Sequence, residues 1–149
     1  MGTHFRGTPE QVRALDTYIK LYRASESVSA RINAHLADYG LTVSQFGVLE
    51  AIYHLGPQHQ ASLADKILKT TGNLTHVIDH LERDGYVERQ RSSEDRRLIY
   101  VHLTDRGRAL VETVLPPHVA GVLAAFDCLT ADEQATLARL CKKVGLSGG

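Results

Sequence analysis

The chain has 149 residues, of which 43% are hydrophobic and 23% are charged. That length suits one domain with enough apolar residues to bury a core, and the composition excludes an intrinsically disordered protein. Lysine plus arginine (17) equals aspartate plus glutamate (17), so the formal net charge is zero with neutral histidine. A nucleic-acid partner must therefore be argued from local features.

We find no export or membrane signal. No apolar run approaches the roughly 20 residues of a membrane span, and the N-terminal MGTHFRGTPE lacks an apolar signal core. The two cysteines, Cys128 and Cys141, form no CxxC pair, so we expect reduced thiols buried in the fold. The sequence thus predicts a soluble, cytoplasmic protein with no membrane partner.

The first predicted element is a helix of about 30 residues, from the cap at Thr8 to Gly40. Thr8, Pro9 and Gln11 follow a capping-box pattern with proline in the first turn. Apolar residues then recur every three or four positions. A helix this long in a small protein usually leaves its own core and packs against a second chain.

Three shorter helices are predicted next. Residues 42–55 form one, with Phe46, Leu49, Ile52 and Tyr53 on its buried side, and Gly56-Pro57 ends it. Residues 62–69 and 73–84 form the other two. Their connector 70–72 is short and contains glycine, as a helix-turn-helix requires.

Two strands and two further helical segments complete the chain. Residues 86–91 and 98–103 alternate as strands around a polar loop. Thr104 is a plausible cap for a helix that Pro116-Pro117 must kink or break, with the helical pattern resuming over 118–126. A second capping box, at 130–133, opens a last helix to Gly145. We therefore predict a mainly α fold with a small β-hairpin wing (α+β), a winged helix-turn-helix flanked by terminal helices.

In a helix-turn-helix the second helix enters the major groove, and its exposed residues reach bases and phosphates. The apolar residues of 73–84 must face inward, namely Leu74, Val77, Ile78 and Leu81. The polar residues left outward or at the turn are Thr70, Thr71, Asn73, Thr75, His76, Asp79 and His80. Considered alone, this face could equally be a solvated helix surface.

The predicted wing carries four cations within nine residues: Arg89, Arg91, Arg96 and Arg97. Glu94 and Asp95 offset two of them. A loop between two strands is thin enough to reach a minor groove, whose negative potential favours arginine. An adjacent carboxylate can fix the direction of the guanidinium through a bidentate pair.

These residues resemble the MarR family, the multiple-antibiotic-resistance regulators. The wing reads D-x-R at 95–97, followed by an apolar strand and L-T-x-x-G at 103–107. The stretches LTVSQFGVLEAI (41–52) and LADKILKTTGNLTHVIDHLERDGYVER (63–89) support the likeness, which spans residues 10 to 145.

The resemblance implies one MarR-like domain over residues 1–149, acting as a homodimer on double-stranded DNA. Helices within 8–40 and 105–145 would form the dimer, and 42–103 the winged DNA-binding lobe. Arg97 would enter the minor groove with Asp95 orienting it, while Arg91 and Arg96 remain candidate DNA contacts. His76 and His80 stand where the family often has arginine. We therefore hypothesise that operator binding tightens as pH falls through the histidine range.

The family also binds small, often phenolic, effectors between the dimer helices and the DNA-binding lobe. By location, the candidate contacts are Tyr18, Tyr22, Arg23, His35, Tyr53 and His54. We predict no catalytic residue, metal or cofactor. The spacing of His76 and His80 could suit a metal, but no third ligand accompanies them.

We predict a sequence-specific dimeric transcriptional regulator, and a repressor rather than an activator. An effector would release it from a palindromic operator. The alternative is a winged helix that binds proteins and not DNA, which the balanced charge favours slightly. An enzyme has no support, since the sequence contains no nucleophile elbow and no glycine-rich phosphate loop.

Overall fold

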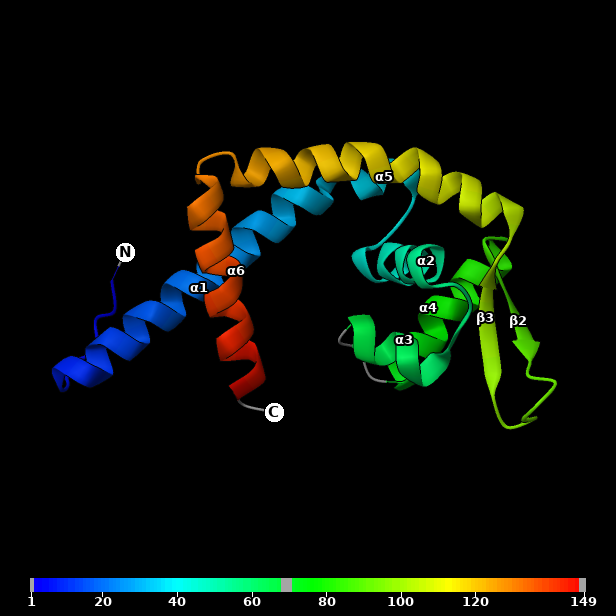
Figure 1. Ribbon diagram of the computed structural model, residues 1–149, viewed down its shortest axis with the longest axis horizontal. Helices are drawn as coiled ribbons and strands as arrows, with labels where there is room; N and C mark the ends of the chain where they lie inside the picture. Colours follow the sequence, from blue (N-terminus) through cyan, green and yellow to red (C-terminus); the bar gives the residue numbers. More distant parts are fainter. Residues whose placement is uncertain (1, 68–70, 148–149) are drawn as a thin grey trace. The chain divides into compact units, whose positions relative to one another are not determined.

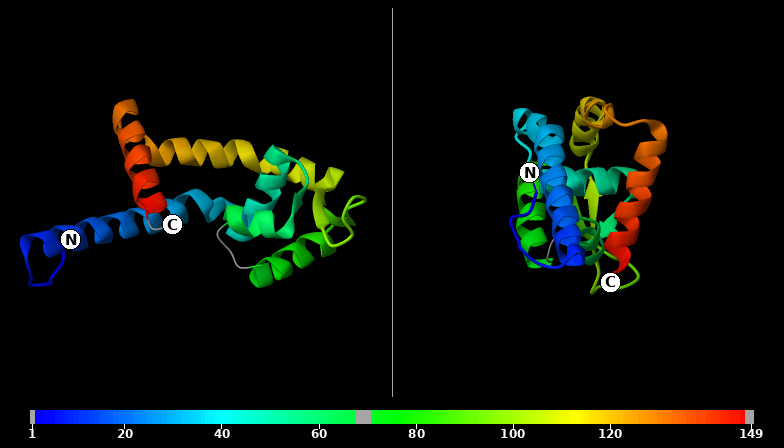
Figure 2. Two further views of the ribbon diagram at one scale, coloured as in Figure 1. Left: turned by 60° about the horizontal axis from the view of Figure 1, so that its bottom comes forward. Right: turned by 90° about the vertical axis from the view of Figure 1, so that its left-hand side faces the viewer.

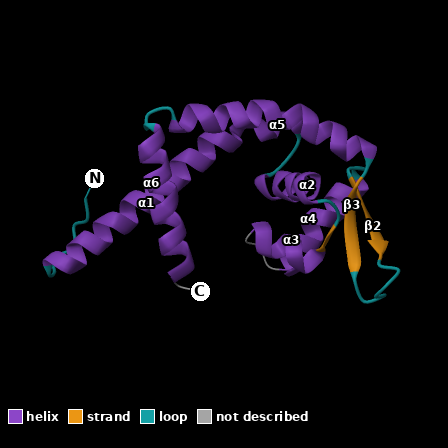
Figure 3. Ribbon diagram, viewed as in Figure 1, coloured by secondary structure: helices purple, strands orange, loops and turns teal. Residues whose placement is uncertain are grey.

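The computed structural model describes residues 2–67 and 71–147, which form helices and a small antiparallel sheet (Figure 1). The chain divides into two compact units. We call Met1–Ala34 together with Val119–Gly149 the helical unit, and His35–His118 the winged unit. The mainly helical fold with a small sheet agrees with the prediction from sequence (Figure 3).

The helical unit contains α1 (Pro9–Asn33), the end of α5 (Asp105–Phe126) and α6 (Ala131–Ser147). Both predicted capping boxes are present. The Thr8 hydroxyl accepts from the Gln11 amide at 3.2 Å, and the Gln11 side chain accepts from the Thr8 amide at 3.0 Å. Thr130 and Glu133 make the same reciprocal pair at 3.2 and 2.9 Å. These bonds satisfy amides that would otherwise lack a partner at each helix start.

The first helix is shorter than predicted. α1 has 25 residues, and a 3-10 helix, η1 (Ala34–Tyr39), replaces its last turns. The Gly40 amide donates to the Ala37 carbonyl, and Gly40 takes the φ of +69° that favours glycine. The stop at Gly40 is therefore confirmed, but the uninterrupted helix of about 30 residues is wrong, because a tighter turn precedes the glycine.

The winged unit begins with three helices, α2 (Val43–Leu55), α3 (Gln60–Ile67) and α4 (Thr71–Arg83). In α2, Phe46, Leu49 and Ile52 are buried as predicted, with Tyr53 half-buried. The predicted connector 70–72 is wrong in part, because the helix already includes Thr71 and Gly72. Residues 68–70, where the preceding helix was predicted to end, lie outside the described residues.

A three-stranded antiparallel sheet follows, in the order β1 (Gln58–His59), β3 (Ile99–Leu103), β2 (Val87–Arg91). The predicted hairpin is confirmed, each strand beginning one residue later than expected. In its register Arg89 lies opposite Val101. β1 was not predicted, because two residues are too few to show an alternation.

The core of the winged unit joins all of these elements. The inward set predicted for α4 is confirmed, since Leu74, Ile78 and Leu81 are fully buried and Val77 is half-buried. Around them pack fully buried side chains from η1, α2, α3, the sheet and α5: Leu36, Val48, Leu49, Leu63, Val87, Val101, Val111 and Val114. This packing fixes α4 against the hairpin and leaves its polar face outward.

Helix α5 runs without interruption from Asp105 to Phe126, with Pro116 and Pro117 inside it. The sequence predicted a kink or a break at these prolines, and the structure excludes the break. Proline fits helical φ, so the helix can continue, although each proline loses one amide hydrogen bond and its ring crowds the carbonyl of the preceding turn. By length and composition α5 could cross a membrane, at a mean hydropathy of 1.5, although no such segment was expected from the sequence. This is weak support for a span, because Val111 and Val114 lie in the core of the winged unit.

The helical unit leaves much apolar surface uncovered. Neither α1 nor α6 contains a buried residue, and Figure 2 shows the two helices apart in its right-hand view. The exposed large apolar side chains in these elements are Tyr18, Leu21, Tyr22, Val119, Leu123, Leu137, Leu140, Val144 and Leu146.

The prediction that both cysteines are buried is wrong for the single chain. Cys128 and Cys141 are free and exposed. Cys128 lies in the turn between α5 and α6, and Cys141 lies on α6, which buries no residue.

Candidate nucleic-acid interface

The outer face of α4 is polar and accessible. Asn73, His76, Asp79 and His80 are exposed, as predicted from their positions between the buried leucines and isoleucine. The ring Nδ1 of His80 lies 2.5 Å from an Arg83 guanidinium nitrogen, so this histidine accepts from a cation one turn away. The helix thus presents hydrogen-bonding groups that suit base edges and phosphates.

Thr75 differs from the other predicted contacts on α4. It is half-buried, and its hydroxyl accepts a hydrogen bond of 2.6 Å from the Gln60 side chain at the start of α3. This bond ties the two helices of the helix-turn-helix together. Thr75 therefore has a structural partner in addition to any role in recognition.

Arg89 connects α4 to the wing and does not belong to the exposed wing cations. Its side chain is only 22% exposed and pairs with Asp79 at 2.7 Å and Glu82 at 2.9 Å. The Arg89 backbone amide also donates to Glu82, at 3.0 Å. A charge-assisted network of this kind sets the angle between helix and strand. Spacing alone put Arg89 among the free cations, because the register that places it over α4 cannot be read from spacing.

The wing loop, residues 92–98, is organised by its own polar groups. The Ser92 hydroxyl accepts from the amides of Glu94 and Asp95, both at 3.2 Å. A guanidinium nitrogen of Arg91 donates to the Arg96 carbonyl at 2.6 Å. Arg91 therefore supports the loop from β2, while the Arg96 side chain is exposed.

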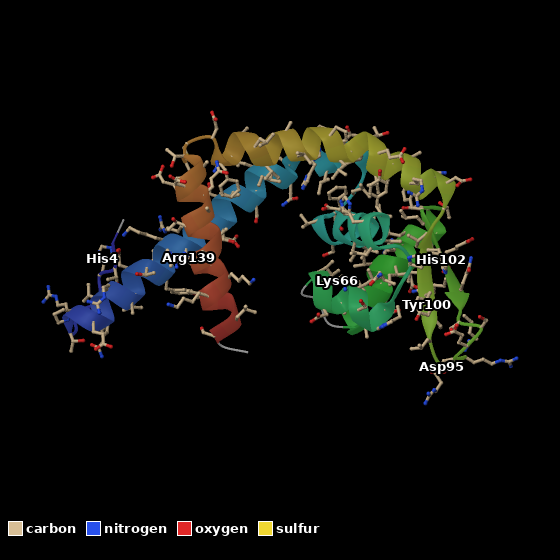
Figure 4. All side chains as sticks on the ribbon, in the orientation of Figure 1. His4, Lys66, Asp95, Tyr100, His102 and Arg139 are labelled. Atoms are coloured by element: carbon tan, nitrogen blue, oxygen red, sulfur yellow. The ribbon has the colours of Figure 1, made fainter. Side chains whose placement is uncertain are left out.

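Asp95 and Arg97 form the pair at the end of the hairpin, where Figure 4 labels Asp95. The Arg97 Nε and a terminal nitrogen donate to the two Asp95 oxygens, each at 3.1 Å, and the Arg97 amide donates at 3.0 Å. These bonds from Arg97 hold the pKa of Asp95 below its usual value, so the carboxylate is charged at neutral pH. The Arg97 side chain is nevertheless 89% exposed, which leaves donors free to bind an external acceptor.

The L-T-x-x-G motif anchors the wing to α5. The Thr104 hydroxyl donates to the Gly85 carbonyl at 2.6 Å and accepts from the Gly107 amide at 3.0 Å. A Cβ on Gly107 would collide with the Tyr86 carbonyl oxygen, so only glycine fits this crossing. The motif can be recognised in the sequence, but the contacts that require glycine and threonine at these positions are seen only in the structure.

Some predicted residues are placed elsewhere or are not described. Thr70 lies outside the described residues, and Thr71 lies in α4.

Of the effector candidates, Tyr18, Tyr22 and Arg23 line a hollow of about 320 Å³ in the helical unit, together with Gly2, Thr3 and His4. The other three candidates belong to the winged unit: His35, Tyr53 and His54. The ring centroids of Tyr53 and His54 lie 5.3 Å apart. Across residues 2–67 and 71–147, no group of three or more histidine, cysteine or acidic side chains is arranged to hold a metal ion.

Comparison with known proteins now identifies the group to which the chain belongs. The model of the MarR family matches residues 41–99, which run from the start of α2 into β3. The chain is 37% identical over 137 residues to the HTH-type transcriptional regulator YkoM of Bacillus subtilis, and the match covers 92% of this chain and 89% of that protein.

Solved structures of DNA-binding regulators also match this chain. A mutant of MarR from E. coli, complexed with operator DNA, has a TM-score of 0.80 at 28% identity, and the match covers 89% of this chain and 95% of that one. A structure of Bordetella bronchiseptica BpsR, whose DNA binding is regulated by 6-hydroxynicotinic acid, has a TM-score of 0.78 at 26% identity. The match covers 87% of this chain and 98% of the BpsR chain. The chain therefore belongs to the MarR family of winged-helix transcriptional regulators, which are DNA-binding proteins and not enzymes.

Proposed function

We propose that this protein is a homodimeric repressor that places α4 in the major groove of a palindromic operator and the wing in the adjacent minor groove. The single observation that carries the proposal is the Asp95–Arg97 pair. Its guanidinium is held on one edge and left almost fully exposed at the end of a thin hairpin. The narrow minor groove attracts a cation presented in this way.

The distribution of charge supports a modest number of phosphate contacts. Asp79 and Glu82 on α4 would repel a phosphate, but Arg89 pairs with both of them. The outward groups that remain on α4 include His76 and His80, which, unlike arginine, are not permanent cations. We therefore propose that the affinity depends less steeply on salt than that of a regulator with arginine at these positions.

The helical unit supports the dimer. α1 and α6 are amphipathic helices without buried residues, and their exposed leucines and valines form the kind of surface that a second copy covers. Two winged units related by a two-fold axis would read two half-sites one duplex turn apart. That symmetry is why we propose a palindromic operator.

A small aromatic effector is the proposed release signal. BpsR, similar to this chain, is regulated by 6-hydroxynicotinic acid, a hydroxylated aromatic acid. In this chain the hollow at Tyr18, Tyr22 and Arg23 offers aromatic rings beside a cation, which suits a phenol or an aromatic carboxylate. An effector that binds one arrangement of the dimer better would shift the population away from the DNA-binding state.

A mobility-shift experiment tests the proposal. DNA from the region flanking the protein's own gene should be bound at nanomolar protein, and a scrambled duplex of the same length should not. Addition of simple phenols or aromatic carboxylates should release the bound DNA. Equal binding of both duplexes would contradict sequence-specific recognition, and absence of binding to either would favour a winged helix that binds proteins.

A further inference from the structure

The first and last residues of the winged unit are both histidines, and their rings are in contact. His35 is its first residue, on η1, and His118 is its last, on α5. The His35 Nε2 and the His118 Nδ1 lie 2.9 Å apart, within hydrogen-bond distance. Both rings are half-buried, and the Phe46 ring from α2 packs against His118 with centroids 4.8 Å apart. The pair thus closes the unit where the chain enters and leaves it.

The hydrogen bond admits only certain proton arrangements. The other nitrogen of His35, Nδ1, is buried and has no hydrogen-bond partner. When His35 Nε2–H donates to His118, that Nδ1 carries no proton and leaves no donor unsatisfied. Adding one proton to the pair while keeping the bond puts a hydrogen on Nδ1, where nothing accepts it. A buried N–H without an acceptor is costly, so the geometry favours the neutral pair.

The charged and titratable neighbours act on the pair in both directions. Burial lowers the pKa of His118, the carboxylate of Glu50 on α2 raises it, and the charge of His35 lowers it, with a lowered pKa as the result. Glu50 is shared with His54, whose ring lies 3.8 Å from its carboxylate. On η1, the Tyr39 ring contacts His35 edge-on at 6.1 Å. No carboxylate is bonded to either ring of the pair in the described residues.

We propose that the His35–His118 pair is a proton-sensitive clasp that closes the winged unit when both rings are neutral and opens when the pair is protonated. Opening separates η1 from α5, which together place Leu36 and Val114 in the core. This device is separate from the exposed His76 and His80 on α4, whose protonation would attract phosphate. The clasp acts on the stability of the unit, so it does not depend on the proposed operator.

The direction of the pH effect follows from the lowered pKa. The unfolded chain takes up the proton at the ordinary histidine value near 6.5, before the folded chain does. Stability from the clasp is therefore complete above that value and falls as pH drops below it. Each pKa unit by which folded His118 lies below 6.5 lowers the folded-to-unfolded ratio about tenfold at acid pH.

Urea unfolding of the 149-residue chain at pH 7.5 and pH 5.5, at one protein concentration, tests the clasp. We expect the wild-type midpoint to fall at pH 5.5. In His118→Gln the midpoint should change much less between the two pH values. Glutamine can accept the hydrogen bond from His35 but does not titrate. His102→Gln is the matched control: it removes a histidine that lies on β3 of the same unit and outside the pair, and it should keep the fall.

A second measurement decides the matter even if His118→Gln does not fold. NMR titration of the wild-type imidazoles should give His118 a pKa below 6.5, with the His35 and His118 signals changing together. An ordinary, independent titration of His118 would overturn the proposal. So would an equal midpoint fall in wild type and a folded His118→Gln.

Discussion

Arg89 and Arg97 lie on one hairpin and are chemically identical, but their surroundings give them different tasks. Arg89 is enclosed by two carboxylates of α4, whereas Arg97 has one carboxylate on one edge and solvent on the other. A guanidinium already saturated by carboxylates has few donors left for DNA. We therefore propose that Arg89 positions the wing against α4 and that Arg97 contacts the DNA.

Arg89→Ala should weaken operator binding without reducing its salt dependence. The substitution frees Asp79 and Glu82 and loosens the angle between α4 and the wing, but it removes no phosphate contact. The slope of log affinity against log salt, measured by fluorescence anisotropy, should match wild type while the affinity falls. A slope smaller by about one would show instead that Arg89 contacts a phosphate.

His76 and His80 should make operator binding tighten as pH falls. Both are exposed on α4, and Asp95 stays charged through this range because its pKa is lowered by Arg97, so the wing pair does not titrate there. We expect the ratio of affinities at pH 6 and pH 8 to be larger in wild type than in the His76→Gln/His80→Gln variant. Comparison of the two proteins cancels any effect of His118. Equal ratios would rule out a contribution from these histidines.

At the scale of the element, the close approach of α5 at Gly107 to Tyr86, the residue before β2, fixes the wing against α5. A Cβ there would collide with the Tyr86 carbonyl oxygen, a backbone atom that cannot rotate away. Gly107→Ala should therefore destabilise the protein by about 1–3 kcal/mol through overpacking. The measurement is the urea midpoint.

Gly121→Ala provides the control for that substitution. It lies in the same helix, and a Cβ there meets nothing within 4 Å. Alanine should be neutral or stabilising by about 0.5–1 kcal/mol, because glycine is a poor helix former. A Gly107→Ala protein as stable as Gly121→Ala would contradict the packing account.

The sequence predicted those elements that carry strong local signals. The capping boxes at Thr8 and Thr130, the stop at Gly40 and the buried face of α4 all follow from short-range patterns, and the structure confirms them. It missed β1, which is two residues long and is fixed by pairing with β3. It also expected Pro116-Pro117 to kink or break the helix, and the helix is not broken there; Val111 and Val114, just before the prolines, pack in the core.

The candidate site was predictable in part for the same reason. The Asp95–Arg97 pair is local, and its bidentate bonds agree with the orientation argued from D-x-R. The role of Arg89 depends on the register of β2 against β3 and on the packing of α4, which are non-local. The meeting of His35 and His118 joins residues 83 positions apart, so no sequence pattern could indicate it.

At the scale of the whole molecule, we propose that the helical unit packs against a second copy of the chain. Leu123 on α5 and Leu140 on α6 are exposed in the single chain. The protein should sediment at twice its 16.4 kDa mass, and Leu140→Glu should shift it toward monomer because a charge would be buried in the interface. Leu55→Glu, an exposed leucine of the winged unit, should remain dimeric. A monomeric wild-type protein would contradict the proposed dimer.

The central claim is that the wing places Arg97 in the minor groove of a specific operator. Anisotropy titration of the operator found by mobility shift, with wild type, Arg97→Ala and Arg139→Ala, tests it most directly. Arg139 on α6 is an exposed arginine of the helical unit, so its substitution makes the same change in charge. We predict that Arg97→Ala weakens binding by about 1–3 kcal/mol and reduces the salt slope, while Arg139→Ala binds as wild type. Wild-type affinity and slope in Arg97→Ala would contradict the account.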